Sequence, residues 1–189
     1  MKFAGNPPSA DDLAELAGRL WEQPEREFQY AGCAFLDRHQ KLLTPGSLAL
    51  LRILITTKSW WDTVDALATG CVGPLVLRNP GLTAAMDNWV LSENVWLARA
   101  AIVHQVGARA ETDTERLFRY ALLRAGDREF FIRKAIGWSL RDYSWRNPDA
   151  VAAFVAEHEA ELSPLTKREA LLVINGGRKN TPGTGRRAN

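Results

Sequence analysis

Apolar side chains recur every three or four positions along most of this chain, with polar positions between them. That spacing gathers apolar side chains on one face of an α-helix. No segment alternates apolar and polar residues as a half-buried strand does, and no Asn-Gly pair joins two such segments as a hairpin turn would. The pattern therefore predicts an all-α fold.

Capping residues and prolines divide this pattern into short helical segments. Ser9 followed by Asp12 has the spacing of a capping box, and the pairs 147–148 (Asn-Pro) and 163–164 (Ser-Pro) begin the last two segments. The other expected starts are Pro24, Pro45, Ser59, Asn79, Ser92, Thr112 and Asp127. Helices of this length with short turns are typical of stacked antiparallel pairs, so we predict a HEAT-like solenoid with a concave face.

Length and composition predict a single domain followed by a tail. With 189 residues and 46% hydrophobic residues, the chain can bury one substantial core, which we assign to residues 1–175. Residues 176–189 are rich in glycine, arginine and lysine, and we expect a disordered basic tail. In this tail, Arg178 and Lys179 are candidate phosphate contacts.

Other features exclude several classes of protein. No run of about 18 apolar residues predicts a membrane span, and no apolar segment near the N-terminus predicts a signal peptide, so we expect a cytoplasmic, nucleoid-associated location. Cys33 and Cys71 lie in helical segments, and we expect buried free thiols. His39, His104 and His158 lack metal-ligand spacing, so we predict no metal site and no cofactor.

The net charge of +2 does not by itself indicate a nucleic-acid partner, so the placement of charges matters more than their sum. The most informative segment is TTKSWWDTVDALA, residues 56–68. Trp61 and Asp65 lie four residues apart and share a helix face, which sets an indole beside a carboxylate. Asp62 lies in the first turn, where it can cap the helix; a purely structural role for Trp61 and Asp65 remains the alternative.

Two further segments place arginine and lysine residues in unusual positions. Arg99 lies between apolar residues of SENVWLARAAIVHQ, where it can form an ion pair or bind a phosphate. Lys134, Trp138 and Arg141 share one helix face within residues 128–145. Two cations around an indole favour a nucleic-acid surface, with phosphates on the cations.

The segments WWDTVD, SENVWLARAAIVHQ, FIRKAIGWSLRDYSWRNP and LSPLTKREAL occur in that order. Together they resemble the AlkD-like DNA alkylation repair glycosylases over roughly residues 20–175. The resemblance implies a HEAT-like solenoid that binds duplex DNA on its concave face. It also implies excision of cationic purines, such as N3-methyladenine and N7-methylguanine, without flipping the base into a pocket.

The resemblance also assigns roles to residues of this chain. It makes Asp65 the catalytic carboxylate, flanked by Trp61 and Trp138, and it makes Arg99 a phosphate-binding residue and Arg141 a further DNA contact. No lysine stands in the matched catalytic motif to form a Schiff base, which implies a monofunctional glycosylase. Members of this family usually begin with an additional helical segment, so we expect about one helix pair fewer here.

Positions near helix ends or on the Trp138 face add Lys58, Arg109 and Lys134 as expected phosphate contacts. The expected partner is double-stranded DNA carrying alkylated bases, and we expect a monomer. Two alternatives stay open: a non-catalytic HEAT-like module that binds damaged or distorted DNA, and a protein–protein scaffold.

Overall fold

A computed structural model of the chain describes residues 9–176, whose regular secondary structure is entirely helical, without strands. The α-helices are α1 (Ala10–Glu22), α2 (Arg26–Arg38), α3 (Ser47–Thr56), α4 (Trp61–Leu67), α5 (Gly73–Arg78), α6 (Thr83–Val90), α7 (Val95–Val103), α8 (Thr114–Leu123), α9 (Phe130–Ser144), α10 (Pro148–Glu157) and α11 (Pro164–Ala170). Short 3-10 turns cover Gln40–Leu42, Pro80–Leu82 and Arg109–Glu111. The all-α prediction is confirmed.

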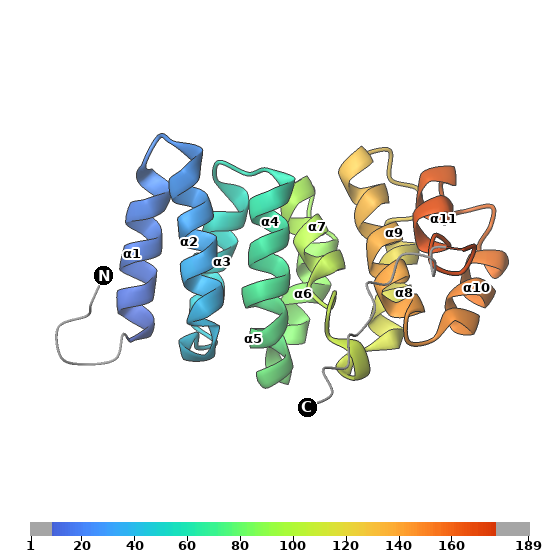
Figure 1. Cartoon of the computed structure of the whole chain (residues 1–189), viewed down its shortest axis with the longest axis horizontal. Coiled ribbons are helices and arrows are strands. Elements are labelled where there is room, and N and C mark those ends of the chain that lie inside the picture. The colour runs from blue at the N-terminus through green and yellow to red at the C-terminus, as the bar shows by residue number, and fades with distance from the viewer. Residues whose placement is uncertain (1–8, 177–189) are drawn as a thin grey trace, which may run out of the picture.

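The helices pack in pairs, and the pairs follow one another in a row from α1 to α11 (Figure 1). α1 packs on α2, α6 on α7, and α9 on α11. A second set of contacts joins the pairs, because α2 packs on α4, α4 on α7, and α7 on α9. This second set brings α4, α7 and α9 together although they are separated in sequence, and these three helices carry most of the candidate site.

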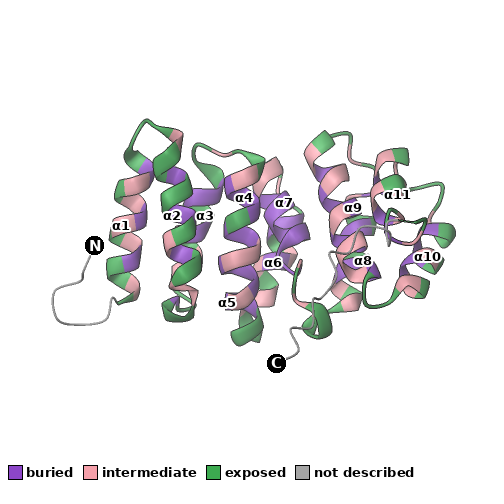
Figure 2. Ribbon diagram, viewed as in Figure 1, coloured by how far each residue is buried: buried purple, intermediate pink, exposed green. Residues whose placement is uncertain are grey.

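The hydrophobic core runs through the whole row as one cluster of buried residues, from Leu13 to Ala170. Figure 2 shows buried segments on the sides where helices face one another and exposed segments on the outside. Fully burying a leucine or isoleucine side chain contributes about 1.5–3 kcal/mol. The helical period therefore places each apolar stripe against the neighbouring helix, which stabilises the stack.

Several predicted helix starts are confirmed. The Ser9 and Asp12 pair forms a capping box, in which the Ser9 hydroxyl accepts from the Asp12 amide at 3.1 Å and the Asp12 carboxylate accepts from the Ser9 amide at 2.8 Å. Asn147 and Ser163 cap α10 and α11, each with a proline in the first turn. These caps satisfy amides that the first turn leaves without partners.

Four other predicted caps are wrong. Asp113, not Thr112, caps α8, because its side chain accepts from the Arg116 amide. Glu129, not Asp127, is the N-cap residue of α9. Asn94, not Ser92, caps α7, because its side-chain oxygen accepts from the backbone amides of the next turn. Ser59 does not cap α4; its hydroxyl donates to the Ile55 carbonyl at 2.6 Å, at the end of α3. No side chain caps α4, whereas near the starts of α7 and α8 two polar side chains lie close together and the backbone path decides which one reaches the free amides.

The sequence pattern also missed the continuation of α4. After Leu67 the chain passes through a π-helical turn, Ala68–Val72, and continues as α5. Gly73 allows α5 to approach α7 closely, because a Cβ there would lie 2.0 Å from the His104 carbonyl oxygen. Within residues 9–176 no helix combines the length and apolar character that spanning a bilayer requires.

Candidate functional site

One pocket of about 370 Å³ gathers six of the site residues that the sequence predicted. Trp61 and Asp65 come from α4, Arg99 from α7, and Trp138 from α9. Its complete lining is Trp61, Asp65, Arg99, Phe130, Phe131, Lys134, Trp138, Arg141 and Glu169. The structure thus brings together residues from four helices that are up to about a hundred positions apart in sequence.

Asp65 and Arg99 form a two-point ion pair at this pocket. Arg99 donates from Nε to Oδ1 at 2.8 Å and from Nη2 to Oδ2 at 2.7 Å. Arg99 also donates from Nη1 to the Phe131 carbonyl oxygen at 2.5 Å. Because three of the five guanidinium N–H groups have these partners, the side chain is fixed, and it fixes the orientation of the carboxylate.

Burial controls the electrostatics of this pair, since Asp65 is 9% exposed and Arg99 is 5% exposed. Burial raises the pKa of the Asp65 carboxyl above its ordinary value, and the guanidinium of Arg99 offsets only part of that effect. An anion held in this setting interacts more strongly with a developing positive charge than an anion in water does. The phosphate contact predicted for Arg99 would have to use its two remaining N–H groups.

Asp62 has a different environment, although it lies one turn from Asp65 on the same helix. It pairs with Arg26 of α2 at 2.6 Å and accepts from the Tyr30 hydroxyl at 2.8 Å. Burial acts to raise the pKa of Asp62, but these partners outweigh it and hold that pKa below its usual value. Asp62 also accepts from the Thr63 amide at 2.6 Å in the first turn of α4, although the N-cap residue is Trp60 and no side chain caps the helix. Its pairing with Arg26 joins α4 to α2.

An aromatic cluster of Trp60, Trp96 and Phe131 adjoins the pocket through Phe131, which also lines it. The rings of Trp60 and Phe131 are 5.4 Å apart, and those of Trp96 and Phe131 are 4.9 Å apart. This contact joins the starts of α4, α7 and α9, and it places the Phe131 carbonyl beside Arg99. The sequence reading missed Phe130 and Phe131 as lining residues. Spacing could have identified Phe130, because it lies four residues before Lys134 and shares the same helix face.

The two cations on α9 are paired with a residue of α11 that the sequence reading also missed. Glu169 accepts from Lys134 at 3.0 Å and from Arg141 at 2.9 Å. Burial alone would raise the pKa of Glu169, but Lys134 and Arg141 hold it below its ordinary value. Glu169 stands in the LSPLTKREAL segment, yet nothing in the spacing of that segment indicates which helix it faces.

The remaining predicted cations lie outside this pocket. The ammonium of Lys58 donates to the carbonyl oxygens of Glu22 and Gln23 at 3.1 and 2.7 Å, at the end of α1. Arg109 has a left-handed backbone conformation and lines a separate groove with Trp145. The structure therefore does not bring either residue to Asp65.

The two tail residues Arg178 and Lys179 lie outside the described residues. Within residues 9–176, no group of three or more potential metal ligands occurs. Both cysteines are buried and free, as expected, and burial raises the pKa of the Cys33 thiol to about 12. They therefore pack in the core as small apolar side chains.

Comparison with known proteins gives a consistent result. The model of a family described as DNA alkylation repair enzyme matches residues 2–174. A solved structure described as a predicted DNA alkylation repair enzyme from Enterococcus faecalis is 30% identical, with a TM-score of 0.78. The match covers 85% of this chain and 75% of that chain. No curated protein sequence matches this chain.

Two structures from Streptococcus mutans support the fold alone, since each is 17% identical to this chain. AlkD2 has a TM-score of 0.69, and the match covers 89% of this chain and 83% of that chain. The protein smu.31 from strain UA159 has a TM-score of 0.67, with coverage of 89% and 85%.

Proposed function

Because this chain belongs to the DNA alkylation repair enzyme family, we propose that it is a monofunctional DNA glycosylase that excises cationic N3- and N7-alkylated purines from duplex DNA. One observation carries the proposal. The Asp65 carboxylate is buried and held at two points by Arg99, in a pocket that Trp61 and Trp138 also line. We propose further that the protein acts as a cytoplasmic monomer within a HEAT-like architecture.

The chemistry of an alkylated purine fits this arrangement. Such a base already carries a positive charge and leaves readily, so no strong general acid is required. The costly step is the development of positive charge at the deoxyribose C1′, which the fixed anion of Asp65 would stabilise. Trp61 and Trp138 would attract the cationic base by cation–π contacts, each worth about 0.5–2 kcal/mol. The base would leave without first being flipped into a pocket.

DNA binding would use the cations that line the same pocket. Lys134 and Arg141 have side chains 37% and 27% exposed, so a backbone phosphate can reach them. Arg99 would act mainly as a positioning residue for Asp65, with its two remaining N–H groups free to meet a phosphate. Sequence-independent phosphate contacts of this kind suit an enzyme that searches duplex DNA for damage.

Lys134 does not change the assignment to a monofunctional enzyme, although its amine lines the pocket. Its ammonium forms an ion pair with Glu169, and an ammonium cannot attack C1′ as a nucleophile. Borohydride treatment during turnover should therefore trap no protein–DNA adduct. A trapped adduct that is lost in Lys134→Gln would show a lyase instead.

The experiment that tests the proposal is single-turnover release of N7-methylguanine at saturating protein. Asp65→Asn removes the charge but keeps the shape, so base release should fall on the order of a hundred-fold or more. Binding to undamaged duplex should remain close to that of the wild type. Because Arg99 is buried, thermal unfolding should be recorded in parallel to confirm that the variant is folded.

The matched control is Asp62→Asn, which breaks an ion pair on the same helix away from the pocket. It should release base near the wild-type rate. Equal losses in both variants would make Asp65 a structural residue. Wild-type protein that binds alkylated duplex but releases no base would be the non-catalytic module.

A further inference from the structure

Glu169 bridges the two cations of α9 that face the pocket. Its Oε1 lies 3.0 Å from Lys134 Nζ, and its Oε2 lies 2.9 Å from Arg141 Nη1. The Glu169 side chain is only 14% exposed, whereas both cations are more exposed than that. One carboxylate therefore uses both oxygens to hold two cations that remain accessible from the pocket.

Close packing between α9 and α11 creates this position. Gly137 lies between Lys134 and Arg141 on the same face of α9, one turn from each. A Cβ at residue 137 would lie 2.5 Å from the Glu169 Cβ. The glycine thus leaves a notch into which Glu169 fits, with one cation on either side.

We propose that Glu169 occupies, in the free protein, the anion site that a DNA backbone phosphate takes on binding. A carboxylate and a phosphate both offer anionic oxygens to the same lysine and arginine donors. DNA must then displace or share this internal carboxylate. Glu169 consequently lowers the affinity of the protein for undamaged duplex and reduces the dependence of that affinity on salt. The identity of the partner as DNA rests on the proposed function.

The competing interpretation predicts the opposite change in DNA affinity when the charge of Glu169 is removed. If Glu169 only orients Lys134 and Arg141 toward the phosphate, removing its charge loosens both cations and weakens DNA binding. If it competes with the phosphate, removing its charge strengthens binding. The direction of change in affinity therefore separates competition from simple support.

The test measures binding of undamaged duplex DNA across a range of salt concentrations, for wild type and Glu169→Gln. We expect several-fold tighter binding for the variant, with the slope of log K against log salt steeper by up to about 0.9. The matched control is Glu159→Gln, which removes one negative charge from a residue paired with Lys167 of α11 outside the pocket. The changes in DNA affinity and in salt slope should both be smaller in Glu159→Gln than in Glu169→Gln.

Two further variants keep the test decisive. Glu169→Asp retains the charge but shortens the side chain, so it should give a smaller gain and covers the case in which Glu169→Gln folds poorly. Adding Lys134→Met to Glu169→Gln should remove the gain. Unchanged or weaker binding in folded Glu169→Gln and Glu169→Asp overturns the inference.

The readout also separates this inference from the proposed function, because undamaged DNA requires no base release. Tighter binding by Glu169→Gln supports the inference even where wild type excises nothing, which would refute only the glycosylase. Active wild type combined with weaker binding by Glu169→Gln and Glu169→Asp would refute only the inference.

Discussion

Trp60 and Trp61 are neighbours in sequence and equally exposed, at 47% each, yet they face different surroundings. Trp60 packs against Trp96 and Phe131, with ring centroids 5.8 and 5.4 Å away. Trp61 lines the pocket together with Asp65. The first indole therefore joins helices, and the second is free to meet a ligand.

This difference predicts opposite effects of two matched substitutions. Trp60→Ala should lower the free energy of unfolding by about 1–3 kcal/mol, because it removes aromatic contacts that join α4 to α7 and α9. Trp61→Ala should change stability by at most about 0.5 kcal/mol but slow base release by several-fold to about thirty-fold. Denaturant unfolding and single-turnover assays of both variants test the pair. The same profile in both variants would contradict the assignment.

The pH dependence of base release should report the ionisation of Asp65. The reaction needs the carboxylate, and burial raises the pKa of Asp65 above its usual 3.8 despite Arg99. The rate should therefore fall as the pH falls, through an apparent pKa above that of an ordinary aspartate. Arg99→Lys loses the two-point contact, so this acid limb should move to higher pH. An acid limb that stays in place in Arg99→Lys would count against Asp65 as the titrating group.

The packing of Gly137 predicts an unusual sign for a glycine-to-alanine change in a helix. Alanine in place of a helical glycine normally stabilises by about 0.5–1 kcal/mol, and Gly18→Ala in α1 should do so because nothing lies within 4 Å of its Cβ. Gly137→Ala should instead destabilise by about 1–3 kcal/mol, since its Cβ would overlap Glu169. Thermal unfolding of the two variants checks the contrast. Stabilisation by Gly137→Ala would show that α11 can move away at little cost.

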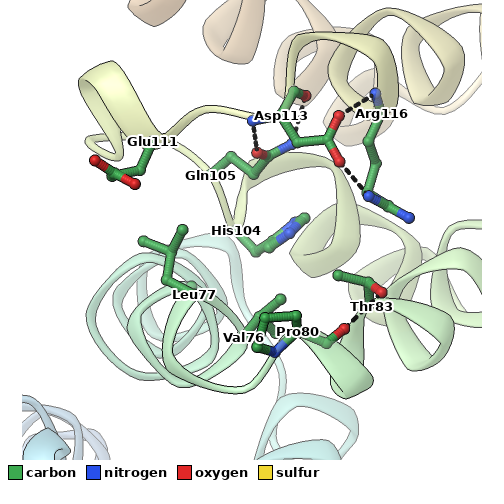
Figure 3. A pocket seen from close by; sticks show the side chains of 10 residues that line it. Val76, Leu77, Pro80, Thr83, His104, Gln105, Glu111, Asp113 and Arg116 are labelled. Carbon is green, nitrogen blue, oxygen red and sulfur yellow. Dashed lines mark hydrogen bonds and ion pairs between the residues drawn. The ribbon is translucent and has the colours of Figure 1, made fainter.

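His104 should make stability depend on pH between about 4 and 6.5. It lines a small pocket beside Gln105 and Arg116 (Figure 3), and burial lowers its pKa from 6.5 to about 4. Its Nδ1 lies 2.6 Å from the Ala101 carbonyl, and in the neutral ring it donates to that oxygen. The unfolded chain binds a proton in this range and the folded one does not. The contribution of neutral His104 to the free energy of unfolding is therefore fully present above pH 6.5. It is lost as the pH falls toward 4, by at most about 3 kcal/mol.

Urea unfolding of wild type and His104→Gln across this range is the measurement. The slope of stability against pH should be smaller in the variant. Asp87 also loses favourable pairing in acid. Its arginine partners hold its pKa well below the usual 3.8, so its contribution to stability is lost only below the pH range in which His104 acts. Identical slopes in the two proteins would contradict the assignment to His104.

The sequence by itself determined the helices and which residues of the candidate site share a helix face. The helical period placed Trp61 with Asp65 on one face, and Lys134 with Trp138 and Arg141 on another, because positions three or four residues apart always meet on a helix. Local capping rules likewise fixed the start of α1 from the spacing of Ser9 and Asp12.

Tertiary structure alone decided which of these faces meet. Asp62 and Asp65 differ by one turn, yet one binds an arginine of α2 and the other an arginine of α7. Glu169 reaches the α9 cations only because a glycine allows α11 to pack closely there. Contacts of this kind depend on how helices stack, a matter of side-chain volume and shape over the whole core, which spacing within a single helix does not encode.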